Sequence, residues 1–134
     1  MYHSVERSGS NTEWPWSISL SLFKKHLDLL CEHGWQTRTI ADMTSGVTND
    51  LTPKTALITF DDGFEDNLDA VEALVQRGMQ ATWFIVSGAI GATPHWHDKG
   101  RPNGKILSAR NLRDMHAVGM EIGSHSVNHR KLPG

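Results

Sequence analysis

The chain has 134 residues, of which 38% are hydrophobic and 21% charged, a composition typical of one globular unit that can form a core. Its formal net charge of -2 at pH 7 and its pI of about 6.4 argue against nucleic acid as a partner, because binding to nucleic acid requires a basic surface. The sequence contains no apolar run long enough to span a membrane, so we expect no membrane segment. It does not begin with a basic region followed by an apolar region, so we expect no export signal and take the cytoplasm as the default compartment.

Helices and strands are predicted to alternate along the chain. Apolar residues recur at helical spacing in three segments, each followed by a glycine that would end the helix. These helices are predicted over residues 21–34, 66–78 and 108–119. Short apolar runs predict strands over residues 56–60, 81–86 and 120–122. This alternation predicts an α/β fold with a parallel sheet or barrel.

The single cysteine, Cys31, lies in the first predicted helix and directly follows two leucines. A lone cysteine cannot form an intrachain disulfide. We expect its side chain to be a small buried apolar group rather than a reactive thiol.

Two polar clusters follow predicted strands, and in parallel α/β folds the ligand site lies at the carboxyl ends of the strands. The first cluster contains Asp61 and Asp62, and the second contains His125 and His129. Neighbouring residues that leave a strand point in different directions, so one aspartate can bind a metal ion while the other faces a substrate. The histidines can present both rings to one ion if the backbone turns helically. Two imidazoles and one carboxylate leave coordination positions open, as in a catalytic site.

Either cluster alone is weak evidence. With 8 histidines in 134 residues, chance produces about 0.5 pairs with this spacing. Two aspartates before a glycine are ordinary turn or helix-capping residues. The position of both clusters at the ends of strands in one predicted sheet is what favours a site.

Other histidines and tryptophans lie near these clusters in the predicted order of elements. His3 could reach the site after a first strand, although an N-terminal histidine is more often simply exposed. We expect His95 and His97, in a turn-rich loop, to be solvated. Tryptophans in loops can stack on sugars, but packing within the loop is the commoner role. The tryptophans in question are Trp14, Trp16 and Trp96.

Taken in order, these motifs resemble the polysaccharide deacetylases, the NodB-homology domain of carbohydrate esterase family 4. Residues 59–63 match the first motif of that family, and residues 125–129 match its second motif, of the form His-Ser/Thr-x-x-His. Residues 2–5 resemble its opening strand, residues 81–84 its Ala-Thr-Phe-Phe strand, and residues 121–124 the lead into its second motif. The resemblance covers nearly the whole chain, and several motifs in the right order are more specific than any one of them.

The resemblance implies an α/β fold that is part of a distorted (β/α) barrel of the glycoside hydrolase/deacetylase type. It implies a hydrolase that removes N-acetyl, or sometimes O-acetyl, groups from a polysaccharide or oligosaccharide, so the partner would be an N-acetylated glycan. Asp61 would be the catalytic base, and Asp62, His125 and His129 would bind a divalent metal ion. Zn²⁺ is the usual ion in this family, and Co²⁺, Ni²⁺ and Fe²⁺ are the other candidates. Such an ion activates water and polarises a carbonyl group.

The chain departs from the family pattern after the second motif. The later motifs, which supply an arginine that orients the base and a histidine that acts as general acid, have no match in it. We therefore expect residues 1–134 to form a single partial NodB-homology domain that lacks its C-terminal strands and is incomplete for catalysis alone. A C-terminal half or an oligomer partner would then cover the open edges of the sheet.

Three other functions stay open on the sequence. A non-catalytic carbohydrate-binding or scaffold fragment would retain the fold without the reaction. A phosphoryl-transfer enzyme would use Asp61 as a nucleophile, but such sites commonly space two aspartates by one residue, whereas Asp61 and Asp62 are adjacent. An iron oxygenase with two histidines and one carboxylate is chemically allowed, although its usual all-β scaffold fits the predicted alternation poorly.

Overall fold

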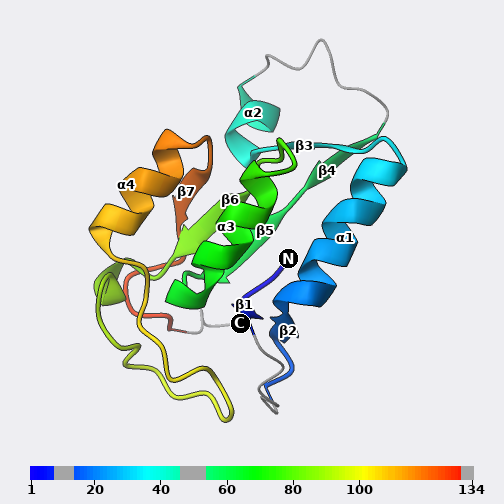
Figure 1. The fold of residues 1–134 in the computed structure, drawn as a ribbon. Coiled ribbons are helices and arrows are strands. Elements are labelled where there is room, and N and C mark those ends of the chain that lie inside the picture. Colours follow the sequence, from blue (N-terminus) through cyan, green and yellow to red (C-terminus); the bar gives the residue numbers. More distant parts are fainter. Residues whose placement is uncertain (8–13, 46–53, 131–134) are drawn as a thin grey trace.

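The computed structural model describes residues 1–7, 14–45 and 54–130 (Figure 1). The strands in these residues are β1 Ser4–Glu6, β2 Ser17–Ser19, β3 Gln36–Arg38, β4 Thr55–Leu57, β5 Thr59–Asp62, β6 Thr82–Ile85 and β7 Glu121–Ser124. The helices are α1 Leu20–Glu32, α2 Ile40–Thr44, α3 Leu68–Val75 and α4 Ala109–Ala117, with the 3-10 turns η2 Glu65–Asn67 and η3 Ser87–Ala89. None of these described helices has the length and apolar character needed to cross a membrane.

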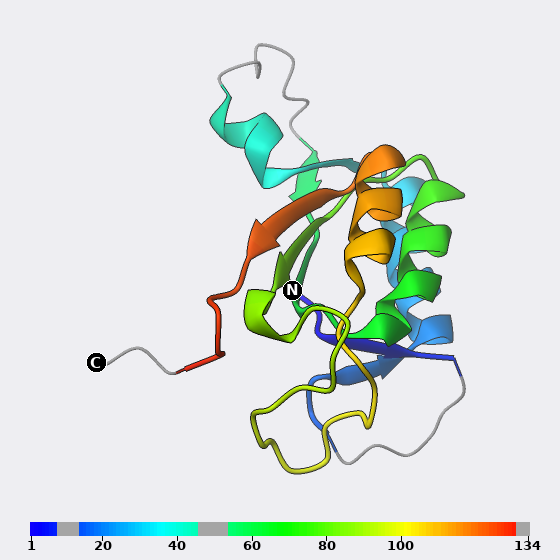
Figure 2. The same ribbon diagram turned by 90° about the vertical axis from the view of Figure 1, so that its left-hand side faces the viewer.

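All strand pairs in the described part of the chain are parallel. Strands β5, β6 and β7 form one sheet in that order, while β1 pairs with β2 and β3 pairs with β4. A parallel bridge between Tyr2 and Phe60 joins the start of the chain to β5. Helices α1, α3 and α4 lie side by side on one face of the sheet (Figure 2). The described strands do not close into a barrel, which agrees with the predicted partial barrel.

The core lies between the sheet and these helices. Phe60 of β5 stacks on Trp83 of β6, with ring centroids 4.3 Å apart and an interplanar angle of 4°, and neither side chain is exposed. Phe23 and Leu27 of α1 and Leu74 of α3 are also fully buried in this core. Each large apolar side chain buried in this way stabilises the fold by roughly 1.5–3 kcal/mol. This packing fixes β5 and β6, and therefore fixes the ends of the strands that carry polar residues.

The three predicted helices are confirmed, with boundaries that differ by a few residues. The predicted stops, Gly34, Gly78 and Gly119, have φ angles of 73°, 64° and 95°, the left-handed conformation that ends helices and that glycine adopts without strain. The predicted strand over residues 56–60 is divided at Ile58 into β4 and β5.

Three short elements, β2, β3 and α2, were not predicted. Helix α2 has a capping box, in which Thr39 and Asp42 each accept a hydrogen bond from the other's backbone N–H. A Thr-x-x-Asp pattern is a recognised signal for the start of a helix and would have located this one. Strand β3 is three residues long, and only Thr37 in it is buried, so it shows no apolar run.

The expectation that Cys31 is buried is wrong, because its side chain is exposed. Its neighbour Leu30 packs against the core. Consecutive residues of an α-helix are about 100° apart around the axis, so the residue after Leu30 is turned away from the sheet.

A carboxyl group connects β1 to the turn that precedes α3. Ser4 donates its hydroxyl hydrogen bond to Asp66 Oδ2 at 2.5 Å, and Asn67 Nδ2 donates to Asp66 Oδ1 at 2.7 Å. Asn67 Nδ2 also donates to the carbonyl oxygen of His3 at 2.9 Å. Burial raises the pKa of Asp66 from its ordinary 3.8 to about 6, against the opposing effect of these hydrogen bonds.

This raised pKa predicts that Asp66 makes the protein less stable as the pH rises. A carboxyl whose pKa is higher in the folded state contributes stability that is complete below its unfolded pKa of about 3.8 and lost as the pH rises through about 6. Asp66→Asn removes the titrating group. The unfolding free energy of the wild type minus that of the variant should therefore be about 2 kcal/mol lower at pH 7 than at pH 4. Urea denaturation at each pH measures this difference. The exposed neighbour Glu65, changed to Gln, is the control, and parallel pH profiles for wild type and Asp66→Asn would contradict the prediction.

Candidate metal centre

Asp62 ends strand β5 in a conformation that is unusual for a residue with a side chain. Its φ angle is 69°, and the next residue, Gly63, has a φ of 88°. Left-handed backbone at a non-glycine residue costs on the order of 1–3 kcal/mol and is concentrated at functional sites. The side chain is buried, with 2% of its surface exposed, and the Asp62 carbonyl accepts a hydrogen bond from the Val86 N–H at 3.2 Å. The fold therefore holds this carboxylate in a fixed, water-poor place.

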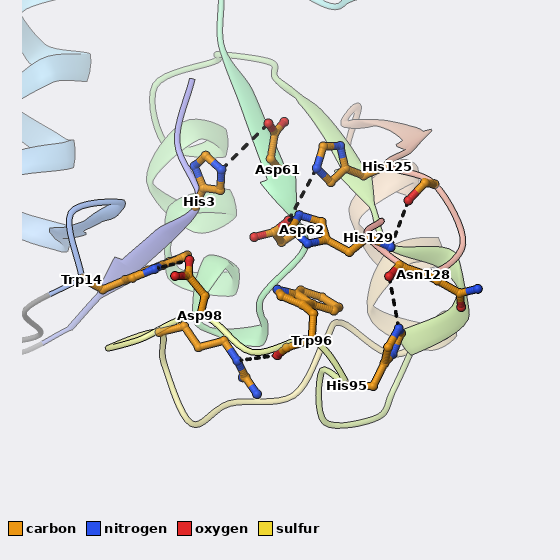
Figure 3. A network of polar contacts seen from close by, with 12 residues as sticks. His3, Trp14, Asp61, Asp62, His95, Trp96, Asp98, His125, Asn128 and His129 are labelled. Carbon is orange, nitrogen blue, oxygen red and sulfur yellow. Dashed lines mark hydrogen bonds and ion pairs between the residues drawn. The ribbon is translucent and has the colours of Figure 1, made fainter. Parts of the chain in front are cut away.

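The two histidines follow β7 in an irregular segment rather than in a helical turn. The N–H of His125 donates to the Ile85 carbonyl at 2.8 Å, which continues the parallel pairing with β6. Ser126 and His129 have φ angles of 64° and 51°. The N–H of His129 donates to Ser126 Oγ at 3.0 Å. The backbone therefore does not turn helically after β7, but it still brings both rings to Asp62 (Figure 3).

The turn after β6 holds this histidine segment in place. The Ser87 N–H donates to the Ser126 carbonyl at 3.1 Å, and the Gly88 N–H donates to the Val127 carbonyl at 2.9 Å. A Cβ atom on Gly88 would lie 2.4 Å from the Val127 oxygen, which is far closer than real contacts allow. Only glycine permits this approach of two backbones.

Three side chains offer metal-ligating atoms that all lie within 4.8 Å of one another, namely those of Asp62, His125 and His129. The Asp62 Oδ1 atom lies 3.1 Å from His129 Nε2 and 3.6 Å from His125 Nε2. Two ligands of one tetrahedral ion, with bonds of about 2.0–2.1 Å, lie about 3.3 Å apart. The spacing of these atoms fits a shared ion.

A second observation supports an ion at this place. Among the described residues, one buried side-chain oxygen, Asp62 Oδ1, makes no hydrogen bond. It contacts the two imidazoles, but these contacts lack hydrogen-bond geometry. A buried carboxylate oxygen without a partner costs several kcal/mol unless a cation or a proton binds it. Burial raises the pKa of Asp62, opposed by the nearby His129, His3 and His125. These residues therefore fit a divalent ion.

Asp61 does not belong to this group of ligands. Its carboxylate lies near His3, whose Nε2 is 4.0 Å from Asp61 Oδ2 (Figure 3). Asp61 and His3 have side chains that are 16% and 15% exposed. The two adjacent aspartates thus have different surroundings. Asp62 contacts His125 and His129, whereas Asp61 lies near His3.

An aromatic residue of the loop over residues 91–104 borders the site. The ring of Trp96 lies 4.6 Å from the ring of His129, at an interplanar angle of 31°. Arg101 braces this loop by donating hydrogen bonds to three backbone carbonyls, those of Pro94, Trp96 and Pro102. His95 and His97 are exposed, as expected from the sequence. The sequence gives no signal for the contact between Trp96 and His129, because it depends on how the loop folds back.

A hollow of about 340 Å³ lies at the opposite end of β6 and β7. It is lined by Thr39, Ala41, Asp42, Gln80, His116, Gly119, Met120, Glu121 and Ile122. The carboxylate of Glu121 accepts hydrogen bonds from the N–H groups of Ile40 and Ala41, at the start of α2, and from the Thr82 hydroxyl. This charge therefore serves to cap a helix, so we place the functional site at the carboxyl ends of the strands.

Comparison with known proteins points to one family. Residues 48–134 match the family described as polysaccharide deacetylase. The protein YxkH of Bacillus subtilis (strain 168), whose name places it in the same family, is 34% identical over 137 residues, which cover 100% of this chain and 43% of YxkH.

Solved structures have the same fold. The structure of IcaB from Ammonifex degensii is 26% identical with a TM-score of 0.76, over 95% of this chain and 51% of that one. The deacetylase PplD of Streptococcus pyogenes, in complex with acetate, is 21% identical with a TM-score of 0.76, over 96% of this chain and 55% of that one. The chain thus spans about half the length of the relatives that it matches.

Proposed function

Because the chain belongs to the polysaccharide deacetylase family, we propose that it forms part of a metal-dependent hydrolase that removes N-acetyl groups from a polysaccharide or oligosaccharide. Residues 1–134 would supply the first part of a single deacetylase domain. The observation that carries the proposal is the buried, unpaired Oδ1 of Asp62 beside two imidazole nitrogens. The family match supports the proposed type of reaction, and this group of side chains supports the proposed position of the metal ion.

We assign to each side chain a role that is compatible with its surroundings. Asp62, His125 and His129 would hold the ion, most often Zn²⁺ in such a donor set. The ion supplies Lewis acidity, which polarises the acetyl carbonyl and lowers the pKa of water. Asp61, outside the ligand group and still partly exposed, would take a proton from the attacking water. Water oxygen bonds to the acetyl carbon, the carbon–nitrogen bond breaks, and the products are acetate and an amine that has gained a proton.

The first test of the proposal is the metal content of the purified protein. After equilibration with a small excess of Zn²⁺ and removal of the unbound ion, we expect close to one ion per chain, because the three ligand atoms are already gathered without help from a fourth residue. His125→Ala should lower the affinity by a factor of at least about 10–100, since it removes one of three protein ligands. Elemental analysis and competition with a chelating dye measure both quantities.

The control for this experiment is His33→Ala, which changes an exposed histidine at the end of α1 and should not alter the metal content. A folded protein that binds no metal would contradict the proposed centre and would favour a non-catalytic carbohydrate-binding or scaffold role. Loss of metal in both His125→Ala and His33→Ala would mean that the measured binding does not occur at the proposed centre.

A further inference from the structure

The loop over residues 91–104 reaches the segment that carries the second histidine. His95 Nε2 donates a hydrogen bond to the Asn128 carbonyl oxygen at 3.3 Å. The next loop residue, Trp96, places its ring 4.6 Å from the ring of His129, at an interplanar angle of 31° (Figure 3). Hydrogen bonds from the turn after β6 hold the first half of the histidine segment, and the loop thus holds the second half.

Trp96 is itself fixed between the core and the imidazole. Its ring lies 6.4 Å from the ring of Phe64, a core residue that is 1% exposed. Its carbonyl oxygen accepts a hydrogen bond from Arg101 Nε at 3.2 Å. Two residues further along the loop, Asp98 Oδ2 accepts a hydrogen bond from Trp14 Nε1 at 2.7 Å. Because the loop is anchored at these points, the indole presents a fixed surface to the imidazole.

The ring of His129 is exposed enough to turn, since 33% of the surface of this side chain is accessible. Its Nε2 lies 3.1 Å from Asp62 Oδ1, so this nitrogen faces the proposed ion. A change of side-chain rotamer would carry the nitrogen away from that position. A flat aromatic neighbour packed against the imidazole opposes the rotation and occupies no ligand position.

From these contacts we infer that Trp96 is a positioning residue for the metal centre, which holds the imidazole of His129 with its Nε2 towards the ion. A ligand that is already ordered binds more tightly, because less conformational freedom is lost when the ion arrives. Metal-ligating histidines are commonly oriented by an outer partner, and here an indole face takes that part. The inference rests on the proposed function, because it assigns a support to a ligand of the proposed centre.

The contact is tested first on the metal-free protein, as the full product of the gene. The ring current of an indole shifts the proton signals of an imidazole packed against it, so we expect the ring signals of His129 to move in Trp96→Ala. The signals of His33, at the end of α1, should stay unchanged. Identical His129 ring signals in the wild type and in Trp96→Ala would overturn the inference.

The effect on the metal centre is measured with Zn²⁺ alone, by competition with a chelating dye. Trp96→Ala should lower the affinity about tenfold, near the upper limit for one aromatic pair and the lower limit for loss of an outer partner of a ligand. Trp96→Phe keeps an aromatic face and should bind Zn²⁺ within about threefold of the wild type. The matched control is Trp35→Ala, which removes an exposed tryptophan just before β3 and should leave the affinity unchanged. Equal losses in Trp96→Ala and Trp96→Phe, or no loss in Trp96→Ala, would overturn the role.

A double-mutant cycle with His129→Ala separates a positioning role from a general loss of structure. If Trp96 acts through His129, then Trp96→Ala should change the Zn²⁺ affinity by less than about twofold when His129 is already alanine. A full tenfold loss in that background would overturn the positioning role. A wild type that binds no Zn²⁺ would instead refute the proposed metal centre, and the metal-free spectra would still decide the contact.

Discussion

Asp61→Asn is expected to lower kcat for acetate release by a factor of about 10²–10⁴, with the metal content unchanged. The amide has the size of the carboxylate but cannot take a proton from water. Asp61 lies outside the group of metal-ligating atoms, so its replacement should not disturb the ion. The measurement is acetate released from N-acetylated glucosamine oligomers by the full gene product, together with elemental analysis of the same samples.

Two further variants make this result specific. Asp62→Asn should lose metal and activity together, because it alters the buried ligand itself. Asp114→Asn, on the exposed surface of α4, should lose neither. Activity of Asp61→Asn equal to that of the wild type would exclude Asp61 as the base. Loss of metal in Asp61→Asn would mean that the two aspartates do not have separate roles.

Gly88→Ala is expected to weaken metal binding by a factor of about 10–100, although residue 88 contributes no ligand atom. The added methyl group would lie 2.4 Å from the Val127 carbonyl oxygen and 3.3 Å from Asn128 Oδ1. Both residues belong to the segment between His125 and His129, so relief of the clash must move at least one ring. The hydrogen bond from the Gly88 N–H to Val127 would be lost in the same step. Zn²⁺ affinity by competition with a chelating dye measures the effect.

The matched control is Gly104→Ala, because an added methyl group there meets no atom within 4 Å. Its metal affinity should equal that of the wild type. Circular dichroism shows whether each variant is folded, and the comparison is made between folded samples. Gly88→Ala with wild-type affinity would contradict the view that the turn after β6 positions the histidines.

Much of the site was predictable because strand ends can be located from local patterns. Residues 56–60 and 120–122 show short apolar runs, so the polar residues that follow them were assigned to one edge of a parallel sheet. The structure places Asp62 and His125 at these ends. The division of roles between Asp61 and Asp62 was suggested by geometry but fixed only by the resemblance to a family, and it stays a prediction.

What could not be predicted depends on contacts between distant segments. The Asp62–Gly63 pair signals a turn, but it does not reveal that Asp62 itself adopts left-handed backbone, since aspartate adopts many conformations in turns. The support of the histidine segment by Gly88 requires the register of β6 against β7, and the position of His3 requires the bridge between Tyr2 and Phe60. Parallel strands are joined by long crossovers rather than by tight turns, so no local turn signal fixes their register.

The parallel pairing of every described strand also governs when the site can form. Parallel neighbours are joined by crossovers, so each pairing closes a long loop, and such topologies fold slowly. His3, Asp62 and His129 come from the first, middle and last parts of the described chain. During synthesis, Asp62 would leave the ribosome before His125 and His129, so the three proposed ligand side chains can come together only after β7 has paired with β6. Binding of a metal ion at the proposed site would then be a late event in folding, which follows the pairing of β7 with β6.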